Sequence, residues 1–284
     1  MKIGVPLFRL RPEQMAAVAQ RAEALGFESV WVPEHLVFPV EIKSRYPYAK
    51  DGAAPVVVDA PHLDPLLILS HLAAVTSRIR LGTNIYILPL RHPLVVARQV
   101  VSLDVLSQGR FTFGIGIGWM EEEFQAVDVD FRSRAARTRE AVRVLDVLWN
   151  ESEPRFEGKF FRFGPVKFEP KPVQRPRPPL VLGGESDVAL RRAAQIGDGW
   201  YGVGHTPETA AAQVAKLRTL RADAGRSDAA FEHTVSLATG TLSRDDVRRY
   251  TDAGVDRVVV LPWRRGREAM DGLQRLADTA LSNP

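Results

Sequence analysis

Short runs of consecutive apolar residues recur along the whole chain, and longer stretches with an apolar residue every three or four positions lie between them. The short runs are typical of strands buried on both faces, and the longer spacing is typical of amphipathic helices. Eight runs fit buried strands: residues 3–8, 29–33, 79–88, 111–117, 180–182, 199–203, 233–238 and 257–261. Strands that alternate with helices in this way predict a parallel sheet with right-handed crossovers.

The helical stretches between the strands carry recognisable start and stop signals. Asp64 and Thr206 each stand directly before a proline, which pairs a side-chain cap with proline at the first helical position. Pro12 can occupy the first turn of a helix that ends at Gly26. A last amphipathic helix covers about residues 267–281.

Eight strands alternating with helices predict an α/β fold, and a (β/α)₈ TIM barrel fits the chain better than an open doubly wound sheet. Periodicity alone leaves the open sheet as an alternative. We expect a single domain over residues 1–284, with an insertion at residues 36–63 after the second strand and another at residues 151–178 before the fifth. The first insertion should lie over the carboxyl ends of the strands, where such barrels place active sites. The second has the pattern of a β-hairpin followed by a proline-rich tether.

Composition narrows the chemistry that this barrel can perform. The chain has no cysteine, which excludes disulfides and thiolate nucleophiles, so any redox chemistry must come from a bound cofactor. The net charge of +4 comes from interspersed basic and acidic residues, and no basic run with aromatics predicts nucleic-acid binding. No apolar run reaches the roughly 20 residues of a membrane helix, and residues 1–14 fit a first strand better than a secretory signal. We expect a cytoplasmic protein without a membrane partner.

Glu34 and His35 stand at the end of the second strand, where a side chain reaches the mouth of a barrel. Imidazole titrates near physiological pH, which suits the transfer of a proton to or from a substrate. The alternative is that His35 caps a loop and Glu34 is a solvated surface charge. Asp59, His62 and Asp64 are residue types that bind metals, but Asp64 is better used as a helix cap, so no metal site is predicted.

Two glycine-rich segments follow the fourth and fifth strands. The first, at residues 114–119, has G-x-G-x-G spacing, which does not fit the dinucleotide fingerprint. Small residues here allow the backbone to approach a planar ring, and they also allow a tight turn. The pattern does not distinguish between these two roles. The second, at residues 183–186, opens a helix over residues 187–196, and free N–H groups at such a start favour a phosphate. Ser186 or Asp187 can also simply cap this helix.

Five segments in register resemble the luciferase-like monooxygenase superfamily: residues 30–39, 71–85, 92–119, 180–200 and 253–260. Within it, the chain is most similar to the branch that uses the deazaflavin coenzyme F420. The resemblance implies a (β/α)₈ barrel, a flavin-like cofactor at the carboxyl ends of the strands, and cytoplasmic oxidoreductase activity.

The resemblance also implies roles for particular residues. It assigns the family's catalytic histidine to His35 and the acidic residue beside it to Glu34, and we expect both to be catalytic residues. In the F420-using branch a non-prolyl cis peptide supports the back of the ring, and the matching bond here joins Asn84 to Ile85. The residues expected to contact the cofactor, with its phosphate at residues 183–186, are Asn84, Ile85, Gly116, Gly118, Trp119, Gly183, Gly184, Glu185 and Ser186.

Three functions fit this sequence. The first is an F420-dependent oxidoreductase that transfers a hydride between C5 of the deazaflavin and a small organic substrate. The second is an FMN-dependent two-component monooxygenase, supplied with reduced flavin by a separate reductase, and the third is a flavin-binding protein without turnover. The sugar-phosphate dehydrogenases of the F420 branch carry a glutamate where this chain has Trp119, which argues against their substrate. We expect a homodimer that associates through exterior helices.

Overall fold

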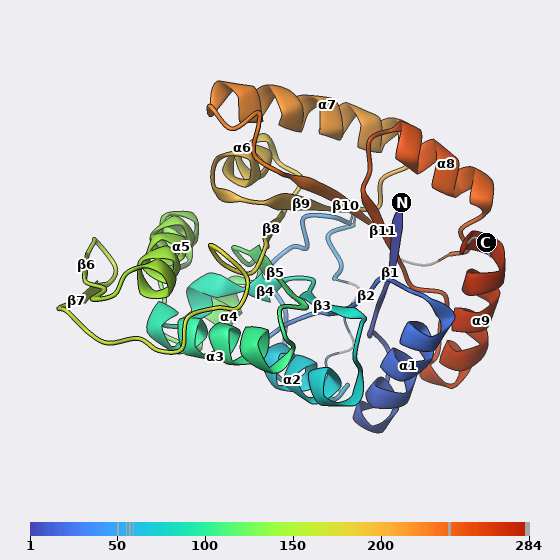
Figure 1. Cartoon of the computed structure of the whole chain (residues 1–284), viewed down its shortest axis with the longest axis horizontal. Helices are drawn as coiled ribbons and strands as arrows, with labels where there is room; N and C mark the ends of the chain where they lie inside the picture. The colour runs from blue at the N-terminus through green and yellow to red at the C-terminus, as the bar shows by residue number, and fades with distance from the viewer. Residues whose placement is uncertain (50, 55, 57, 59, 238–239, 282–284) are drawn as a thin grey trace.

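Eight parallel strands close into a barrel in the computed structural model, which describes residues 1–284 except 50, 55, 57, 59, 238–239 and 282–284 (Figure 1). The pairing of the last strand with the first and of the third with the fourth barrel strand completes the ring. In ring order the strands are β1 (Lys2–Pro6), β2 (Ser29–Val32), β3 (Arg80–Thr83), β5 (Phe111–Gly116), β8 (Leu180–Gly183), β9 (Gly199–Val203), β10 (Glu232–Leu237) and β11 (Arg257–Val260). The (β/α)₈ prediction is confirmed, and the open sheet is wrong.

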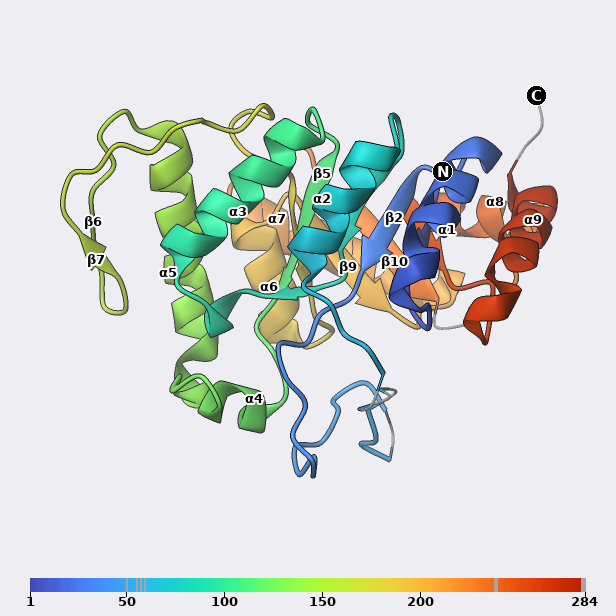
Figure 2. The ribbon, with the colours of Figure 1, turned by 90° about the horizontal axis from the view of Figure 1, so that it is seen from below.

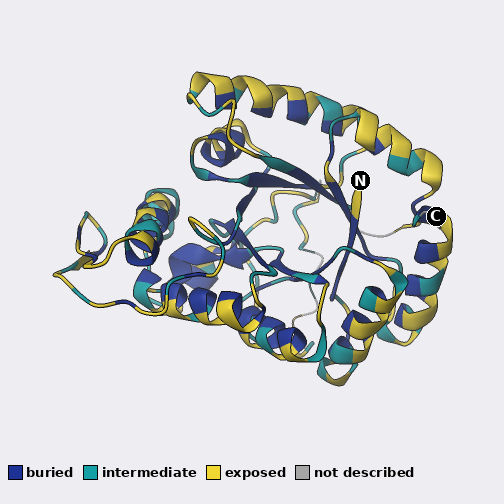
Figure 3. Ribbon diagram, in the orientation of Figure 1, coloured by how far each residue is buried: buried dark blue, intermediate teal, exposed yellow. Residues whose placement is uncertain are grey.

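Helices surround the ring and turn their apolar faces toward it (Figure 3). This arrangement buries the strands on both faces, which is why they are continuous apolar runs in the sequence. The surrounding helices are α1 (Pro12–Leu25), α2 (Pro65–Val75), α3 (Pro93–Leu106), α5 (Arg134–Asn150), α6 (Asp187–Ile196), α7 (Pro207–Asp223), α8 (Arg244–Asp252) and α9 (Ala269–Ala280). The predicted caps at Asp64 and Thr206 and the stop at Gly26 are confirmed. Among the described residues, no helix is both long and apolar enough to cross a membrane.

The third predicted strand, residues 79–88, is interrupted in the structure. The chain forms β3, then a second short strand β4 (Tyr86–Ile87), then the 3-10 helix η1 (Leu88–Leu90). Between β3 and β4 the Asn84–Ile85 peptide bond is cis, as the resemblance implies. A cis bond shortens the step between consecutive Cα atoms and turns the chain, so one continuous strand was the wrong prediction here.

Both insertions lie outside the barrel wall. The first, residues 36–63, crosses one end of the barrel beside α4 (Glu121–Gln125), and its described part contains no helix or strand (Figure 2). The second contains the predicted hairpin, formed by β6 (Phe156–Glu157) and β7 (Arg162–Phe163), on the outer side of α5. The first insertion therefore covers the end at which the strands finish, and the second does not.

Candidate active site

A cavity of about 840 Å³ opens where the barrel strands end. Its wall takes residues from the end of every barrel strand, from Pro6 at the end of β1 to Leu261 after β11, and from residues 45–48 of the first insertion. The volume lies within the range of small-molecule and cofactor sites. The long loop after β2 thus closes one side of a site that the barrel alone would leave open.

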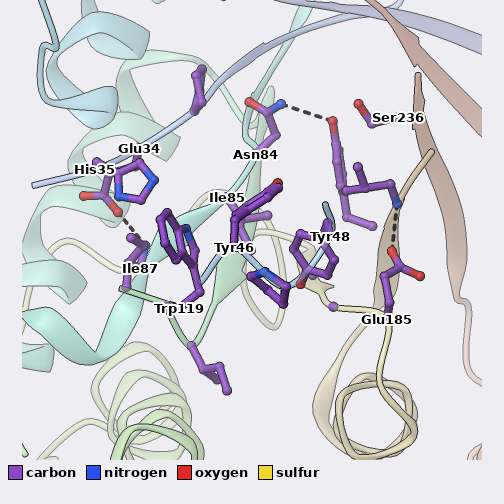
Figure 4. A pocket seen from close by; sticks show the side chains of 18 of the residues that line it. Glu34, His35, Tyr46, Tyr48, Asn84, Ile85, Ile87, Trp119, Glu185 and Ser236 are labelled. Carbon is purple, nitrogen blue, oxygen red and sulfur yellow. Dashed lines mark hydrogen bonds between the residues drawn. The ribbon is translucent and has the colours of Figure 1, made fainter. Parts of the chain in front are cut away.

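Most of the residues expected at the site line this cavity (Figure 4). They are Glu34, His35, Asn84, Ile85, Gly118, Trp119, Gly183, Gly184, Glu185 and Ser186. Gly116 is not among the lining residues, because the side chain of Ile85 covers it, and a Cβ at Gly116 would collide with the Cδ1 atom of Ile85. Gly116 therefore acts on the cavity only through the position of Ile85. The expected contacts between these residues and a cofactor remain predictions.

His35 is held by a buried carboxylate on α4, which follows β5, two strands further round the barrel than β2. Its Nδ1 atom lies 3.2 Å from Oε2 of Glu123, whose side chain is fully buried on α4. The other oxygen of Glu123 accepts hydrogen bonds from the backbone N–H groups of Leu36, at 2.5 Å, and Val37, at 3.4 Å. A carboxylate can only accept, so Nδ1 carries a proton and Nε2 is the nitrogen free to exchange one with a bound molecule.

Replacing Glu123 by glutamine is expected to reverse the tautomer of His35. The amide oxygen must stay on the N–H of Leu36, so the amide NH₂ faces Nδ1 and forces the ring proton onto Nε2. We expect turnover to fall by about 10²-fold. Nitrogen-15 NMR of labelled histidine reports the tautomer directly.

Glu122→Gln is the matched control for this change. Glu122 also holds the first insertion in place, because its carboxylate accepts hydrogen bonds from Lys43 and Ser44. It does not contact His35. It should leave both the tautomer and the turnover unchanged. Equal losses in the two variants would show that Glu123 acts only by holding the loop.

Glu34 is a buried ion, not a solvated surface charge. Its carboxylate accepts a hydrogen bond from the N–H of Ile87 and pairs with the guanidinium of Arg91. Burial is the largest influence and raises the pKa of Glu34 to about 7, with the nearby charge of Glu123 adding to the rise, while Arg91 and Ile87 oppose it. Both oxygens are occupied, so Glu34 holds the end of β4 beside His35.

No sequence pattern predicted Arg91 at the site, where its positive charge pairs with the carboxylate of Glu34. Its guanidinium lies 4.5 Å from the ring centroid of Tyr86 and 3.8 Å from Oδ2 of Asp64, which also caps α2. Arg91 and Glu123 stand 57 and 88 positions along the chain from the residues that they hold. In the sequence, Arg91 is recognisable only as a charged residue shortly before a helix. Glu123 is recognisable only as part of the acidic turn after the glycines of residues 114–118.

An aromatic wall covers the insertion side of the cavity. The ring centroid of Trp119 lies 5.8 Å from that of His35 and 5.2 Å from that of Tyr46, which in turn lies 5.2 Å from Tyr48. Phe38 packs on His35 at 4.7 Å. Trp263, which follows β11, does not join this wall, because it is buried and donates its indole N–H to the carbonyl of Phe8. The wall gives the cavity a mainly apolar face next to His35.

The opposite side of the cavity is built on Asn84 and Ile85. The Nδ2 atom of Asn84 donates to the hydroxyl of Tyr201 at 3.1 Å, and its Oδ1 atom is buried without a partner among the described residues. Ile85 packs against Trp31 and Tyr201 inside the barrel. Burial raises the pKa of Tyr201 to about 12, so its hydroxyl stays neutral. An apolar ledge at Ile85 therefore faces the cavity, with the Oδ1 atom of Asn84 buried beside it.

The segment after β8 forms the start of α6. Ser186 caps this helix, since its Oγ atom accepts from the N–H of Ala189 at 3.3 Å. Glu185 turns aside and accepts from the N–H of Val203 at 2.8 Å, and its other oxygen lies 2.7 Å from Nε2 of His205. The cap and a phosphate site are compatible, because the first-turn N–H groups of a helix have no partner within it.

Gly184→Ala is expected to weaken cofactor binding at least tenfold. Gly184 has φ +131, and a Cβ there would lie 2.6 Å from the Cβ of Ala189, so the start of α6 must move. Gly204→Ala is the control, because Gly204 has φ +74 with nothing within 4 Å of its Cβ position. Both variants should lose stability, and only the first should lose affinity in a titration. Unchanged affinity in Gly184→Ala would remove this segment from the cofactor site.

Comparison with known proteins identifies relatives of this arrangement. The family model for luciferase-like monooxygenase matches residues 6–280. An uncharacterized protein of Mycobacterium tuberculosis H37Rv is 34% identical over 282 residues, which cover 98% of each chain. The F420-dependent glucose-6-phosphate dehydrogenase of Kineococcus radiotolerans is 36% identical over 66% of this chain and 52% of its own length. The FMNH₂-dependent dimethylsulfone monooxygenase of Pseudomonas putida is 31% identical over 48% of this chain and 38% of its own.

The barrel also matches solved structures over its whole length. An F420-dependent secondary alcohol dehydrogenase, in complex with an F420–acetone adduct, superimposes with a TM-score of 0.78 at 19% identity, covering 98% of this chain and 97% of that one. At this identity the likeness shows the shared fold.

Proposed function

The chain belongs to the luciferase-like monooxygenase family, and from that membership we propose that it is an F420-dependent oxidoreductase acting on a small organic substrate. The observation that carries the proposal is the pairing of two surfaces in one cavity: a proton-exchanging His35 and the Asn84–Ile85 ledge. The F420-dependent names of a relative and of a structural neighbour support this choice of cofactor.

The cavity has the features that a tricyclic cofactor needs. The ledge at Ile85 offers an apolar surface to the ring, and the Oδ1 atom of Asn84 is a buried acceptor without a protein partner. Gly118, Gly183 and Gly184 bring backbone close to the cavity. When bound, the deazaflavin supplies hydride chemistry at C5.

The protein's own part in the reaction is to move a proton and to exclude water. His35 exchanges a proton at Nε2 with the substrate atom that gains or loses negative charge as hydride moves, and Glu123 stabilises the histidinium form. Glu34 would support the site by fixing the end of β4 through Ile87, with Arg91 as its counter-charge. The aromatic wall favours a mainly apolar substrate and shields it from water.

An FMN-dependent monooxygenase is the second candidate, supported by the FMNH₂-dependent relative. Anaerobic titration of the apoprotein with F420 and with FMN separates the two. We expect F420 to bind at least tenfold more tightly, and reduced FMN in air to give no oxygenated product. Tighter FMN binding with product formation would establish the monooxygenase instead, and tight F420 binding without turnover on broad substrate panels would favour a binding protein.

We further propose a cytoplasmic location and a homodimer, with a separate reductase needed only in the FMN case. Light scattering of the purified protein tests the dimer. A mass near that of the 31.5 kDa chain would reject it.

A further inference from the structure

Arg192 is a buried cation that has no counter-charge among the residues that the structure describes. It lies on α6, lines the cavity, and is only 5% exposed. It makes no hydrogen bond and no ion pair with any residue that the structure describes, and its Nε atom is fully buried without a partner. An unpaired buried guanidinium is destabilising, and an anionic ligand in the cavity would supply the missing counter-charge.

Two other arginines lie close enough to Arg192 to lower its pKa. Burial lowers the pKa of Arg192, and the positive charges of Arg139 and Arg134 lower it further. Arg134 also lines the cavity, with its guanidinium 3.7 Å from the ring centroid of Phe131 and its own Nε atom buried without a partner. Two cations therefore line the same cavity. An anion bound near them would stabilise both positive charges.

The start of α6 lies on the same wall. Ser186, Ala189 and Arg192 follow one another at intervals of three residues, which places them along one face of the helix. The carboxylate of Glu185, which also lines the cavity, is already bound by Val203 and His205, and that of Asp187 is paired with Lys216. The helix N-terminus and Arg192 can therefore act on one anion without competition from Glu185.

We propose that Arg192, assisted by Arg134, binds the phosphate group of the cofactor's side chain at the start of α6. The inference rests on the proposed function, because it requires a cofactor that carries phosphate. F420 and FMN both carry one, as a diester and a monoester, and the geometry fits the shared group. Arg192 is then the cation that selects a phosphorylated cofactor over its phosphate-free form.

Matched ligand pairs isolate the phosphate from the ring. Affinities are measured by anaerobic titration for FMN against riboflavin, and for F420 against its deazaflavin–ribitol part without phosphate. Wild type should prefer the phosphorylated member of the pair that it binds. Arg192→Met should reduce that preference by about 10- to 100-fold and leave the phosphate-free affinity within twofold. Arg191→Met, an exposed neighbour on the same helix, should change neither.

The apoprotein provides a second measurement that needs no cofactor. Removing an unpaired buried charge should leave the melting temperature of Arg192→Met equal to or above that of wild type, and inorganic phosphate should raise the melting temperature of wild type only. A lower melting temperature, an undiminished phosphate preference, or an equal loss for the phosphate-free ligand would each overturn the inference. Failure of wild type to bind F420 or FMN would instead reject the proposed function.

Discussion

Replacing His35 by glutamine is expected to lower turnover by about 10²- to 10⁴-fold while cofactor affinity changes less than threefold. Glutamine keeps a polar side chain of similar reach but cannot exchange a proton near neutral pH. The proposed cofactor ledge at Asn84 and Ile85 lies between β3 and β4 and does not depend on His35. Steady-state kinetics with a substrate that wild type turns over, together with anaerobic titration, measure the two effects separately.

His71→Gln is the control for this variant, since His71 is an exposed histidine on α2. It should match wild type in both measurements. Near-normal turnover in His35→Gln would show that another group handles the proton. A parallel loss of cofactor affinity would show that His35 binds the cofactor and would contradict its assignment as the acid–base group.

Replacing Arg91 by methionine is expected to lower the free energy of unfolding by about 3–5 kcal/mol at pH 9 and by less at pH 6. The change removes the ion that faces the buried carboxylate of Glu34. At high pH this leaves an uncompensated charge in the barrel, whereas at lower pH the carboxyl group takes up a proton and the cost falls. Urea unfolding at several pH values measures the difference.

The direction of this pH dependence follows from the pKa of Glu34, which lies at about 7 in the folded protein against an ordinary value of 4.5. The folded state therefore holds the additional proton, and its contribution to stability is complete below about pH 4.5 and is lost as the pH rises toward 7. Without Arg91 the folded pKa rises further, so the loss continues above pH 7 at up to about 1.4 kcal/mol per pH unit.

The double variant Glu34→Gln, Arg91→Met tests this explanation. It carries no buried charge at this position, while the amide oxygen can still accept from the N–H of Ile87. We expect it to recover most of the stability lost at pH 9, because a neutral pair often equals a buried ion pair in stability. A double variant as unstable as Arg91→Met would mean that the loss comes from packing against Tyr86, and not from charge.

The architecture was predictable because its signals are local. A strand buried on both faces must be apolar throughout, and a helix on the barrel must repeat its apolar positions, so each element is visible within its own segment. β9 was predicted to the residue, as residues 199–203, and α6 as residues 187–196. Seven other strands were placed within a few residues, and the one error in continuity, at β3 and β4, coincides with the cis bond.

The sequence by itself determined the barrel, the family and the end of the barrel at which the site lies. It also placed His35 and residues 183–186 at that end, because strand order and chain direction decide which segments meet there. Only the tertiary structure decided that Glu123 orients His35, that Arg91 neutralises Glu34, and that Arg192 is buried without a counter-charge. These facts depend on side chains from separate strands and helices approaching within a few ångströms, and on the loss of water between them. A local pattern of apolar and polar residues contains no information about which distant side chains meet or about the water lost between them.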